Sequence, residues 1–218
     1  MLDQILPTRV VVAATRGDSD VSLFPEEEWI VRHAIESRRR EFATARACAR
    51  DALVRLGVPS QAIPAGPQGN PIWPPRVVGS ISHCDDYRVA AVAHERDFVT
   101  IGIDVEPNQP LPDGVLEFIA SADEVEQVRQ WLRDAPTLCW DRLLFSIKEA
   151  VYKAWFPLTA RSLGFEDAAI TVDRACQEFS VQLPAAGFPR CGAEQFHLSG
   201  RWLIVNGLVA AAIALPAS

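Results

Sequence analysis

Apolar residues along this chain recur with two different periods, one typical of strands and one typical of helices. Continuous apolar runs predict buried strands in the first half, at residues 9–14, 78–84 and 88–94. Between the first two runs, apolar positions recur about every three to four residues from Pro25 to Gly57, which predicts a helix with a break near Ser37. Residues 59–76 are rich in Pro, Gly and Gln and predict a loop.

The second half again combines helices with short strands. Residues 121–124 (Ser-Ala-Asp-Glu) form a capping box that begins a helix ending near Asp134. A second helix is expected from about Leu138 to Trp155, with a buried stripe of Trp140, Leu144, Ile147, Val151 and Ala154. The tail predicts strands joined by turns at Ser199-Gly200 and Asn206-Gly207, the strands being 168–173, 178–183, 195–198, 201–205 and 208–215.

Each half therefore combines a long helix with antiparallel strands. This arrangement predicts an α+β fold with two similar α/β lobes, in each of which a sheet packs on a helix. The Pro-rich, polar connector at 108–114 marks the expected boundary. We accordingly expect an N-terminal lobe of residues 1–112 and a C-terminal lobe of residues 113–218.

Composition narrows the class of protein. The chain has 218 residues, 49% of them apolar and 22% charged, which is enough for a compact core. The formal net charge of −7 disfavours a general nucleic-acid binder, which would be basic. The five cysteines follow no disulfide or zinc spacing and are expected to be small buried residues. The N-terminus lacks the pattern of a signal peptide, and the apolar run 207–217 is too short to span a membrane, so we expect a cytoplasmic protein.

Lysine occurs at two positions only, Lys148 and Lys153, and the other nineteen basic residues are arginines. A compact ammonium suits a reacting phosphate in a way that a planar guanidinium does not. Glu149 and Lys153 are four residues apart and share one face of the predicted helix. Taken alone, such a pair is usually a surface salt bridge.

Two more carboxylates lie on the predicted strand 98–107. Its odd-numbered residues Val99 to Val105 share one face, and the even-numbered residues Thr100 to Glu106 share the other. Asp104 and Glu106 therefore project side by side and repel each other unless they share a cation. Gly102 is expected to leave room beside them for a ligand. With Glu149 they form an oxygen donor set suited to Mg²⁺, with Mn²⁺ as the alternative.

Basic residues concentrate on the first helix. Its predicted solvent face carries Arg38, Arg39, Arg40, Arg46 and Arg50, and Ser82-His83 ends a strand. Carboxylates, lysines and arginines together describe a site for a polyphosphate ester, with metal-assisted phosphoryl transfer or hydrolysis as the matching chemistry.

Several motifs in this order resemble those of the 4′-phosphopantetheinyl transferases. Ile101-Gly102-Ile103-Asp104-Val105-Glu106 and Phe145-Ser146-Ile147-Lys148-Glu149-Ala150-Val151-Tyr152-Lys153 are similar to the paired signature of that family. The length resembles the larger, Sfp-type class, a single-chain pseudodimer. Stretches 39–46, 73–84 and 163–167 resemble its EntD-like, siderophore-synthase branch.

The resemblance implies transfer of the 4′-phosphopantetheine arm of coenzyme A to a serine of an acyl or peptidyl carrier protein, with release of 3′,5′-ADP. Carriers of fatty-acid, polyketide or nonribosomal-peptide synthases would be the partners. The implied enzyme is a holo-[acyl-carrier-protein] synthase that acts as a monomer, with its ligand site at the lobe interface.

The resemblance also implies roles for single residues. Asp104, Glu106 and Glu149 would hold Mg²⁺, and Glu149 would act as ligand, as base or as both. Lys153 would neutralise the β-phosphate or the leaving ADP, and Lys148 would help hold the pyrophosphate. The adenosine and 3′-phosphate end would be held by Arg38, Arg46, Ser82 and His83. The family's basic residue before Pro71 is absent here, and whether Arg76 replaces it stays open.

Two other functions remain as alternatives. The first is an inert module that binds coenzyme A or a nucleotide, which the presence of all three carboxylates and both lysines disfavours. The second is a Mg²⁺-dependent phosphodiesterase, since the same residue types also suit cleavage of a phosphate ester.

Overall fold

A computed structural model describes residues 1–184 and 195–217. Two compact units divide the chain, Leu2–Ile101 with the C-terminal residues from Ala214, and Gly102–Ile213 with Met1. The division falls between Ile101 and Gly102, and not at the connector 108–114 where we expected a lobe boundary from the sequence. The strand that carries Asp104 and Glu106 therefore belongs to the same unit as Lys153.

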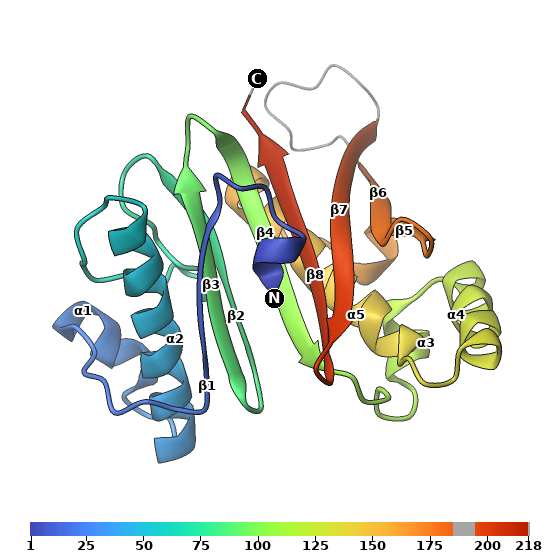
Figure 1. Ribbon diagram of the computed structural model, residues 1–218, viewed down its shortest axis with the longest axis horizontal. Helices are drawn as coiled ribbons and strands as arrows, with labels where there is room; N and C mark the ends of the chain where they lie inside the picture. Colours follow the sequence, from blue (N-terminus) through green and yellow to red (C-terminus); the bar gives the residue numbers. More distant parts are fainter. Residues whose placement is uncertain (185–194, 218) are drawn as a thin grey trace. The chain divides into compact units, whose positions relative to one another are not determined.

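The first unit is built on a three-stranded antiparallel sheet with the order β1-β3-β2. Its elements are η1 (Leu2–Gln4), β1 (Val11–Arg16), α1 (Pro25–Glu28), η2 (Trp29–Val31), α2 (Glu36–Arg55), β2 (Val77–Cys84) and β3 (Tyr87–His94). Figure 1 shows the long helix α2 lying along this sheet, and α2 packs on β1 and β3. The predicted strands and the loop at 59–76 are thus confirmed, and the break in the helix lies just before Glu36.

Apolar side chains of α2 and the sheet form the core of this unit. The buried cluster contains Ala13, Cys48, Ala49, Ala52, Leu53, Ile63, Val77, Ala90 and Val92. Alanines on α2 allow the helix backbone to lie close to the strands, because their side chains are small. The helix ends before Gly57, whose φ of +86° is the left-handed conformation that glycine adopts at helix ends without strain.

The second unit contains a five-stranded sheet with the order β4-β8-β7-β6-β5. Its elements are β4 (Phe98–Pro107, from Gly102 on), α3 (Val115–Ile119), α4 (Ala122–Asp134), α5 (Trp140–Thr159), η3 (Phe165–Asp167), β5 (Ala169–Asp173), β6 (Glu178–Pro184), β7 (Gln195–Val205) and β8 (Leu208–Pro216, up to Ile213). Asn206 and Gly207 form the predicted turn between β7 and β8, both with positive φ. The coarse prediction of mixed α/β structure with antiparallel sheets is confirmed.

The predicted turn at Ser199-Gly200 is wrong, because β7 runs through it. Ser199 and Gly200 pair with Ser180 and Phe179 of β6. A Cβ atom on Gly200 would lie 2.3 Å from the Phe179 ring and 2.4 Å from the Ala212 carbonyl oxygen. Glycine is needed here for a close approach inside the sheet, which the sequence does not distinguish from a turn.

Helix α5 packs directly against β4. All five predicted stripe residues of α5, from Trp140 to Ala154, are buried. A Cβ atom on Gly102 would lie 2.0 Å from the Ala150 carbonyl oxygen and 2.8 Å from the Ala154 Cβ atom. The space beside Gly102 that we expected a ligand to fill is therefore filled by the helix. Ile101, Ile103 and Val105 are buried on one face of the strand, and Thr100, Gly102 and Asp104 are buried on the other. Val99 is instead 41% exposed.

Of the four cysteines in the part of the chain that the structure describes, Cys48 and Cys84 are buried as expected, Cys139 is half-buried and Cys176 is exposed. Cys191 lies outside the described residues. Among residues 1–184 and 195–217, none of the helices has the length and apolar character needed to cross a membrane.

Candidate functional site

The carboxylates of β4 and the charged residues of α5 come together in the second unit. Asp104 is buried to all but 4% of its side chain, and its Oδ1 accepts a hydrogen bond from Lys153 Nζ at 2.7 Å. Because Gly102 lets α5 lie against β4, Glu149 and Lys153, which are one turn apart along the helix, face the end of the strand. The structure thus brings Asp104, Glu106, Glu149 and Lys153 into one cluster.

Burial and repulsion by Asp104 raise the pKa values of two carboxyl groups in this cluster, Glu106 and Glu149. Burial and the charge of Asp104 raise the pKa of Glu106 to about 7, although Arg142 and Lys153 act in the opposite direction. Burial also raises the pKa of Glu149, where the attraction of Lys153 is opposed by the repulsion of Asp104. Carboxyl groups whose pKa values are raised by burial and by like charges attract either a proton or a cation.

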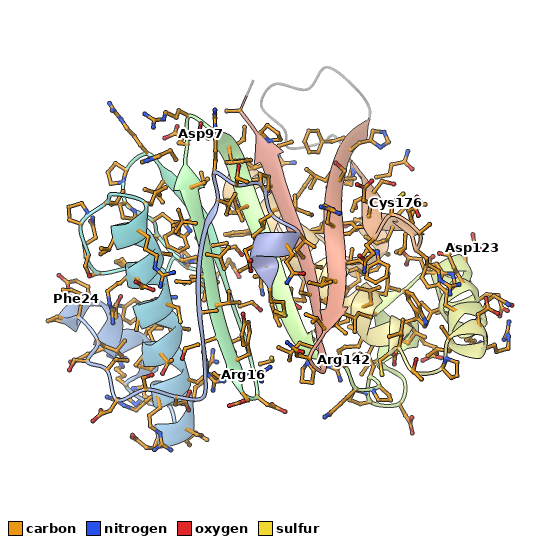
Figure 2. All side chains as sticks on the ribbon, in the orientation of Figure 1. Arg16, Phe24, Asp97, Asp123, Arg142 and Cys176 are labelled. Atoms are coloured by element: carbon orange, nitrogen blue, oxygen red, sulfur yellow. The ribbon has the colours of Figure 1, made fainter. Side chains whose placement is uncertain are left out.

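Arg142 is a member of this cluster that we did not predict. Its Nη1 atom lies 3.1 Å from Glu106 Oε2, and its Nε and Nη2 atoms donate to the Gln109 and Pro110 carbonyl oxygens at 3.0 Å each. Figure 2 labels this side chain, which lies near the start of α5. Arg142, Glu149 and Lys153 are spaced by seven and four residues, so they form one stripe on a helix. That spacing is the sequence signal that identifies Arg142.

Asp104, Glu106 and Glu149 form a set of oxygen donors that suits a divalent cation such as Mg²⁺. The charge of Asp104 acts on both glutamates, which indicates that the three carboxylates lie near one another. Within residues 1–184 and 195–217, no group of three His, Cys, Asp or Glu side chains has a geometry ready to hold a metal ion. The metal site therefore remains a prediction, based on the chemistry of the residues.

Lys148 has an arrangement that differs from the expected one. It is 3% exposed, and its ammonium donates to Glu124 Oε2 at 3.0 Å and to the Phe165 and Ala168 carbonyl oxygens at 2.8 and 3.2 Å. All three donor hydrogens of the ammonium are thus used inside the unit. This geometry does not fit the expected contact between Lys148 and a pyrophosphate.

A pocket of about 250 Å³ lies beside Glu149. We call it the α5 pocket, and its lining residues are Lys148, Glu149, Tyr152, Leu163, Gly164, Phe165 and Ala168. Its volume is near the lower end of the range for small-molecule sites, about 300 Å³. Because the Lys148 ammonium is engaged elsewhere, the pocket presents mainly apolar surface and one carboxyl group, which suits an uncharged chain better than a phosphate.

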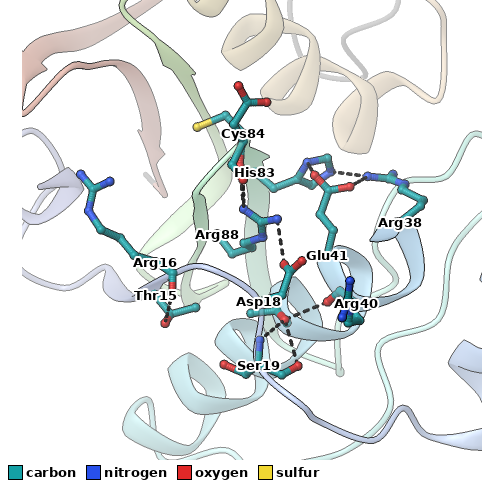
Figure 3. A network of polar contacts seen from close by, with 12 residues as sticks. Thr15, Arg16, Asp18, Ser19, Arg38, Arg40, Glu41, His83, Cys84 and Arg88 are labelled. Carbon is teal, nitrogen blue, oxygen red and sulfur yellow. Dashed lines mark hydrogen bonds and ion pairs between the residues drawn. The ribbon is translucent and has the colours of Figure 1, made fainter. Parts of the chain in front are cut away.

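A second cluster lies in the first unit, at the end of β2 and the start of α2. Figure 3 shows Arg38, Glu41 and His83 in mutual contact. His83 Nδ1 lies 2.8 Å from Glu41 Oε1, Arg38 Nη1 lies 3.1 Å from His83 Nε2, and Arg38 forms an ion pair with Glu41. The structure therefore brings together Arg38 and His83, as predicted, and adds Glu41, which lies one turn after Arg38.

Charge holds Glu41 ionised in this cluster. Burial alone pushes the pKa of Glu41 upward, but the hydrogen bond from Arg38 and the charges of His83, Arg38 and Arg88 together hold it below its usual value. Arg88 is buried, pairs with Asp18 at 2.8 Å and donates to the Cys84 carbonyl oxygen at 2.7 Å (Figure 3). It thereby fixes the turn that follows His83.

Two other predicted site residues are buried in the first unit. Arg46 is 4% exposed, donates from Nε to the Ile63 carbonyl oxygen at 3.0 Å and stacks on Phe42. Burial, opposed by Glu27, lowers the pKa of Arg46 to about 10. Arg46 therefore does not lie on a solvated basic face, contrary to our expectation. Ser82 is also buried, at 2% exposure.

Comparisons with known proteins point in one direction. Residues 26–93 match the model of the 4′-phosphopantetheinyl transferase N-terminal domain, and residues 100–211 match that of the 4′-phosphopantetheinyl transferase superfamily. The chain is 46% identical to the 4′-phosphopantetheinyl transferase Npt of Nocardia iowensis, over 98% of this chain and 99% of that protein. It is 44% identical to PptT of Mycobacterium tuberculosis, over 88% and 85%. Identity to enterobactin synthase component D of Salmonella typhi is lower, 32% over 77% and 72%, and confirms the resemblance to that branch.

Proposed function

The chain belongs to the 4′-phosphopantetheinyl transferase superfamily, and on this premise we propose that it transfers the phosphopantetheine arm of coenzyme A to a carrier-protein serine. The observation that carries the proposal is the cluster of Asp104, Glu106, Glu149 and Lys153. It combines carboxylates with a lysine ammonium 2.7 Å from one of them. This is the combination that phosphoryl transfer requires, since the reaction depends on positioning and on charge neutralisation.

Asp104, Glu106 and Glu149 would hold Mg²⁺, with Mn²⁺ as the alternative. A bound divalent cation would neutralise charge on the pyrophosphate of coenzyme A. The raised pKa values of Glu106 and Glu149 support this assignment, because a cation would relieve the repulsion that contributes to them.

Glu149 would also accept the proton of the attacking serine. Burial raises its pKa above the ordinary value of a glutamate, and a higher pKa makes the carboxylate a stronger base. The serine oxygen would form the new bond to the β-phosphorus, and the bond to the bridging oxygen would break, releasing 3′,5′-ADP. Lys153 would stabilise the charge that develops on the phosphate oxygens.

The α5 pocket would take the pantetheine chain. Glu149 forms part of its lining, so an uncharged chain in the pocket would begin beside the reacting phosphate. Tyr152, Leu163 and Phe165 offer apolar contacts to such a chain. These lining residues were not predicted from the sequence.

The nucleotide end of coenzyme A remains assigned to residues of the first unit. Arg38 and His83 are the better supported of the four predicted residues, because both are partly exposed and contact each other. Arg46 and Ser82 are buried and would act by supporting their neighbours. The expected pseudodimer, monomeric state, cytoplasmic location and choice among fatty-acid, polyketide, nonribosomal-peptide and siderophore carriers belong to the same proposal.

One assay separates this function from the two alternatives. The protein is incubated with coenzyme A, Mg²⁺ and an apo carrier protein, and the carrier is weighed by mass spectrometry. A gain equal to one phosphopantetheine group is expected. Tight coenzyme A binding without any gain across several carriers would support an inert binding module instead. Release of nucleotide in the absence of carrier would support a phosphodiesterase.

A further inference from the structure

A buried ion pair supports one wall of the α5 pocket. Lys148 Nζ lies 3.0 Å from Glu124 Oε2, and the side chains are 2% and 9% exposed. Lys148 comes from the middle of α5, one residue before Glu149, and Glu124 comes from the first turn of α4. A buried pair of opposite charges is retained without net cost only when its remaining donors and acceptors are satisfied.

Those remaining donors and acceptors form hydrogen bonds with four backbone groups. Glu124 Oε1 accepts from the Ile170 amide at 3.1 Å, and Glu124 Oε2 also accepts from the Ser121 amide at 2.9 Å. Lys148 donates to the Phe165 and Ala168 carbonyl oxygens. The pair therefore ties the start of α4 and the middle of α5 to the backbone of residues 165–170.

The tied backbone is the pocket wall. Leu163, Gly164, Phe165 and Ala168 line the α5 pocket opposite the α5 residues Glu149 and Tyr152. Residues 164–168 consist of the short 3₁₀ helix η3 with one residue on either side, and two hydrogen bonds between Gly164 and Asp167 close this turn. The Lys148 ammonium contributes two bonds to this turn from a helix whose position is set by its buried stripe.

We propose that Lys148 and Glu124 are positioning residues that shape the α5 pocket for the uncharged end of coenzyme A, and that Lys148 does not bind phosphate. This inference rests on the proposed function, since it uses coenzyme A as the ligand. Loss of the pair frees the wall at residues 163–168 and weakens binding of the pantetheine chain. Because the Lys148 ammonium is already bonded to Glu124, Phe165 and Ala168, we expect binding of the nucleotide phosphates to be unchanged.

The test compares two ligands that differ in the pantetheine chain. Affinities for coenzyme A and for 3′,5′-ADP, which lacks that chain, are measured by calorimetry for the full-length protein. Glu124→Gln removes the ion pair and keeps the size of the side chain. Glu126→Gln is the matched control, because Glu126 lies on the same helix, is 69% exposed and pairs only with exposed Arg133 in the described contacts.

We expect Glu124→Gln to weaken coenzyme A binding by about tenfold and to change 3′,5′-ADP binding by less than about twofold. The double variant Lys148→Met with Glu124→Gln should show the same split. It removes both charges together, so it avoids the unpaired buried charge that either single variant leaves and that can destabilise the fold. Hydrogen exchange of peptides covering 163–170 should speed up in both, and Glu126→Gln should behave as the parent protein.

Equal loss of affinity for both ligands would overturn the inference, because it would indicate that Lys148 binds the phosphates. Unchanged affinity for both ligands, together with faster hydrogen exchange at 163–170, would show that the ion pair has only a structural role. That result would also overturn the inference. Failure of the parent protein to modify any carrier would count against the proposed function alone, because the binding split is measured without a carrier.

Discussion

At the scale of single residues, the site depends on carboxyl groups whose environment changes their chemistry. Sequence spacing was sufficient to select Asp104, Glu106, Glu149 and Lys153. It could not show that burial raises the pKa of Glu106 to about 7, because burial depends on which elements cover the strand. It also could not separate an exposed arginine from a buried one on the same helix, as Arg38 and Arg46 demonstrate.

Replacing Glu149 with glutamine should separate catalysis from binding. Glutamine has the same shape but cannot accept the serine proton or carry a charge, so we expect kcat to fall by about 10²- to 10⁴-fold. Coenzyme A affinity, measured by calorimetry without metal, should stay within about threefold of the parent value. Glu178→Gln, an exposed change on β6, serves as control. Turnover at the parent rate in the Glu149 variant would remove this residue from the mechanism.

Transfer should depend on the ionisation of Glu106. Because the pKa of Glu106 is about 7, a proton competes with the cation below that pH, and both Mn²⁺ affinity and kcat/KM should fall as pH decreases through about 7. Arg142 lowers this pKa, so Arg142→Met should move the midpoint to higher pH. This midpoint would be measured by electron paramagnetic resonance of bound Mn²⁺ over a pH range of roughly 5 to 9, which is centred on neutrality. A midpoint that does not move in this variant would contradict the role of Arg142.

The same pKa has a consequence for stability. In the folded chain Glu106 holds its proton up to about pH 7, whereas in the unfolded chain it loses the proton near its ordinary value of 4.5. The folded state therefore binds more protons between these two values, and this group makes the free energy of unfolding decrease as pH rises from 4.5 to about 7. Urea titrations should show this decrease in the metal-free parent protein and a smaller one in Glu106→Gln. An equal decrease in both would assign the effect to other groups.

At the scale of elements, the packing of α5 on β4 decides whether the cluster forms. The apolar stripe of α5 was predictable from its helical period, and all five residues are buried. The role of Gly102 was not predictable, because a glycine in a strand can make room either for a bound ligand or for a closely packed helix. The same ambiguity explains the error at Gly200, where a close approach in the sheet resembled a turn.

Gly102→Ala should be more damaging than an alanine at a glycine with open surroundings. Its Cβ atom would lie 2.0 Å from the backbone oxygen of Ala150, so α5 must move, and we expect a loss of about 3 kcal/mol or more. Gly114→Ala has nothing within 4 Å and a φ of +81°, and should cost only about 1 kcal/mol through backbone strain. Urea unfolding would compare them. Equal losses would show that α5 adapts to the added methyl group.

At the scale of the whole molecule, the two units share strands. β4 runs from Phe98 to Pro107 and β8 from Leu208 to Pro216, and the division between the units falls inside both strands. A strand loses its pairing when its neighbour unfolds, so unfolding of one unit removes part of the other.

We therefore expect a single cooperative unfolding transition. Trp131, Trp140 and Trp202 have their rings in contact within the second unit, so tryptophan fluorescence reports mainly on that unit. Circular dichroism reports on the helices of both units. The two signals should have the same midpoint in urea, and Trp73→Phe, which removes a tryptophan of the first unit, should leave the fluorescence midpoint close to that of circular dichroism. Two separated transitions would contradict the coupling through β4 and β8.

The sequence by itself determined the combination of long helices with antiparallel strands, the shared face of Asp104 and Glu106 on β4, the shared face of Glu149 and Lys153 on α5, and the family. These features follow from the period and spacing of residues within one element, and the local sequence determines both. Only the tertiary structure decided which partner each charge has: Lys148 with Glu124, Arg142 with Glu106, and Arg46 with the Ile63 carbonyl oxygen. Such partners come from segments 17 to 36 residues away in the chain, so packing and not spacing brings them together.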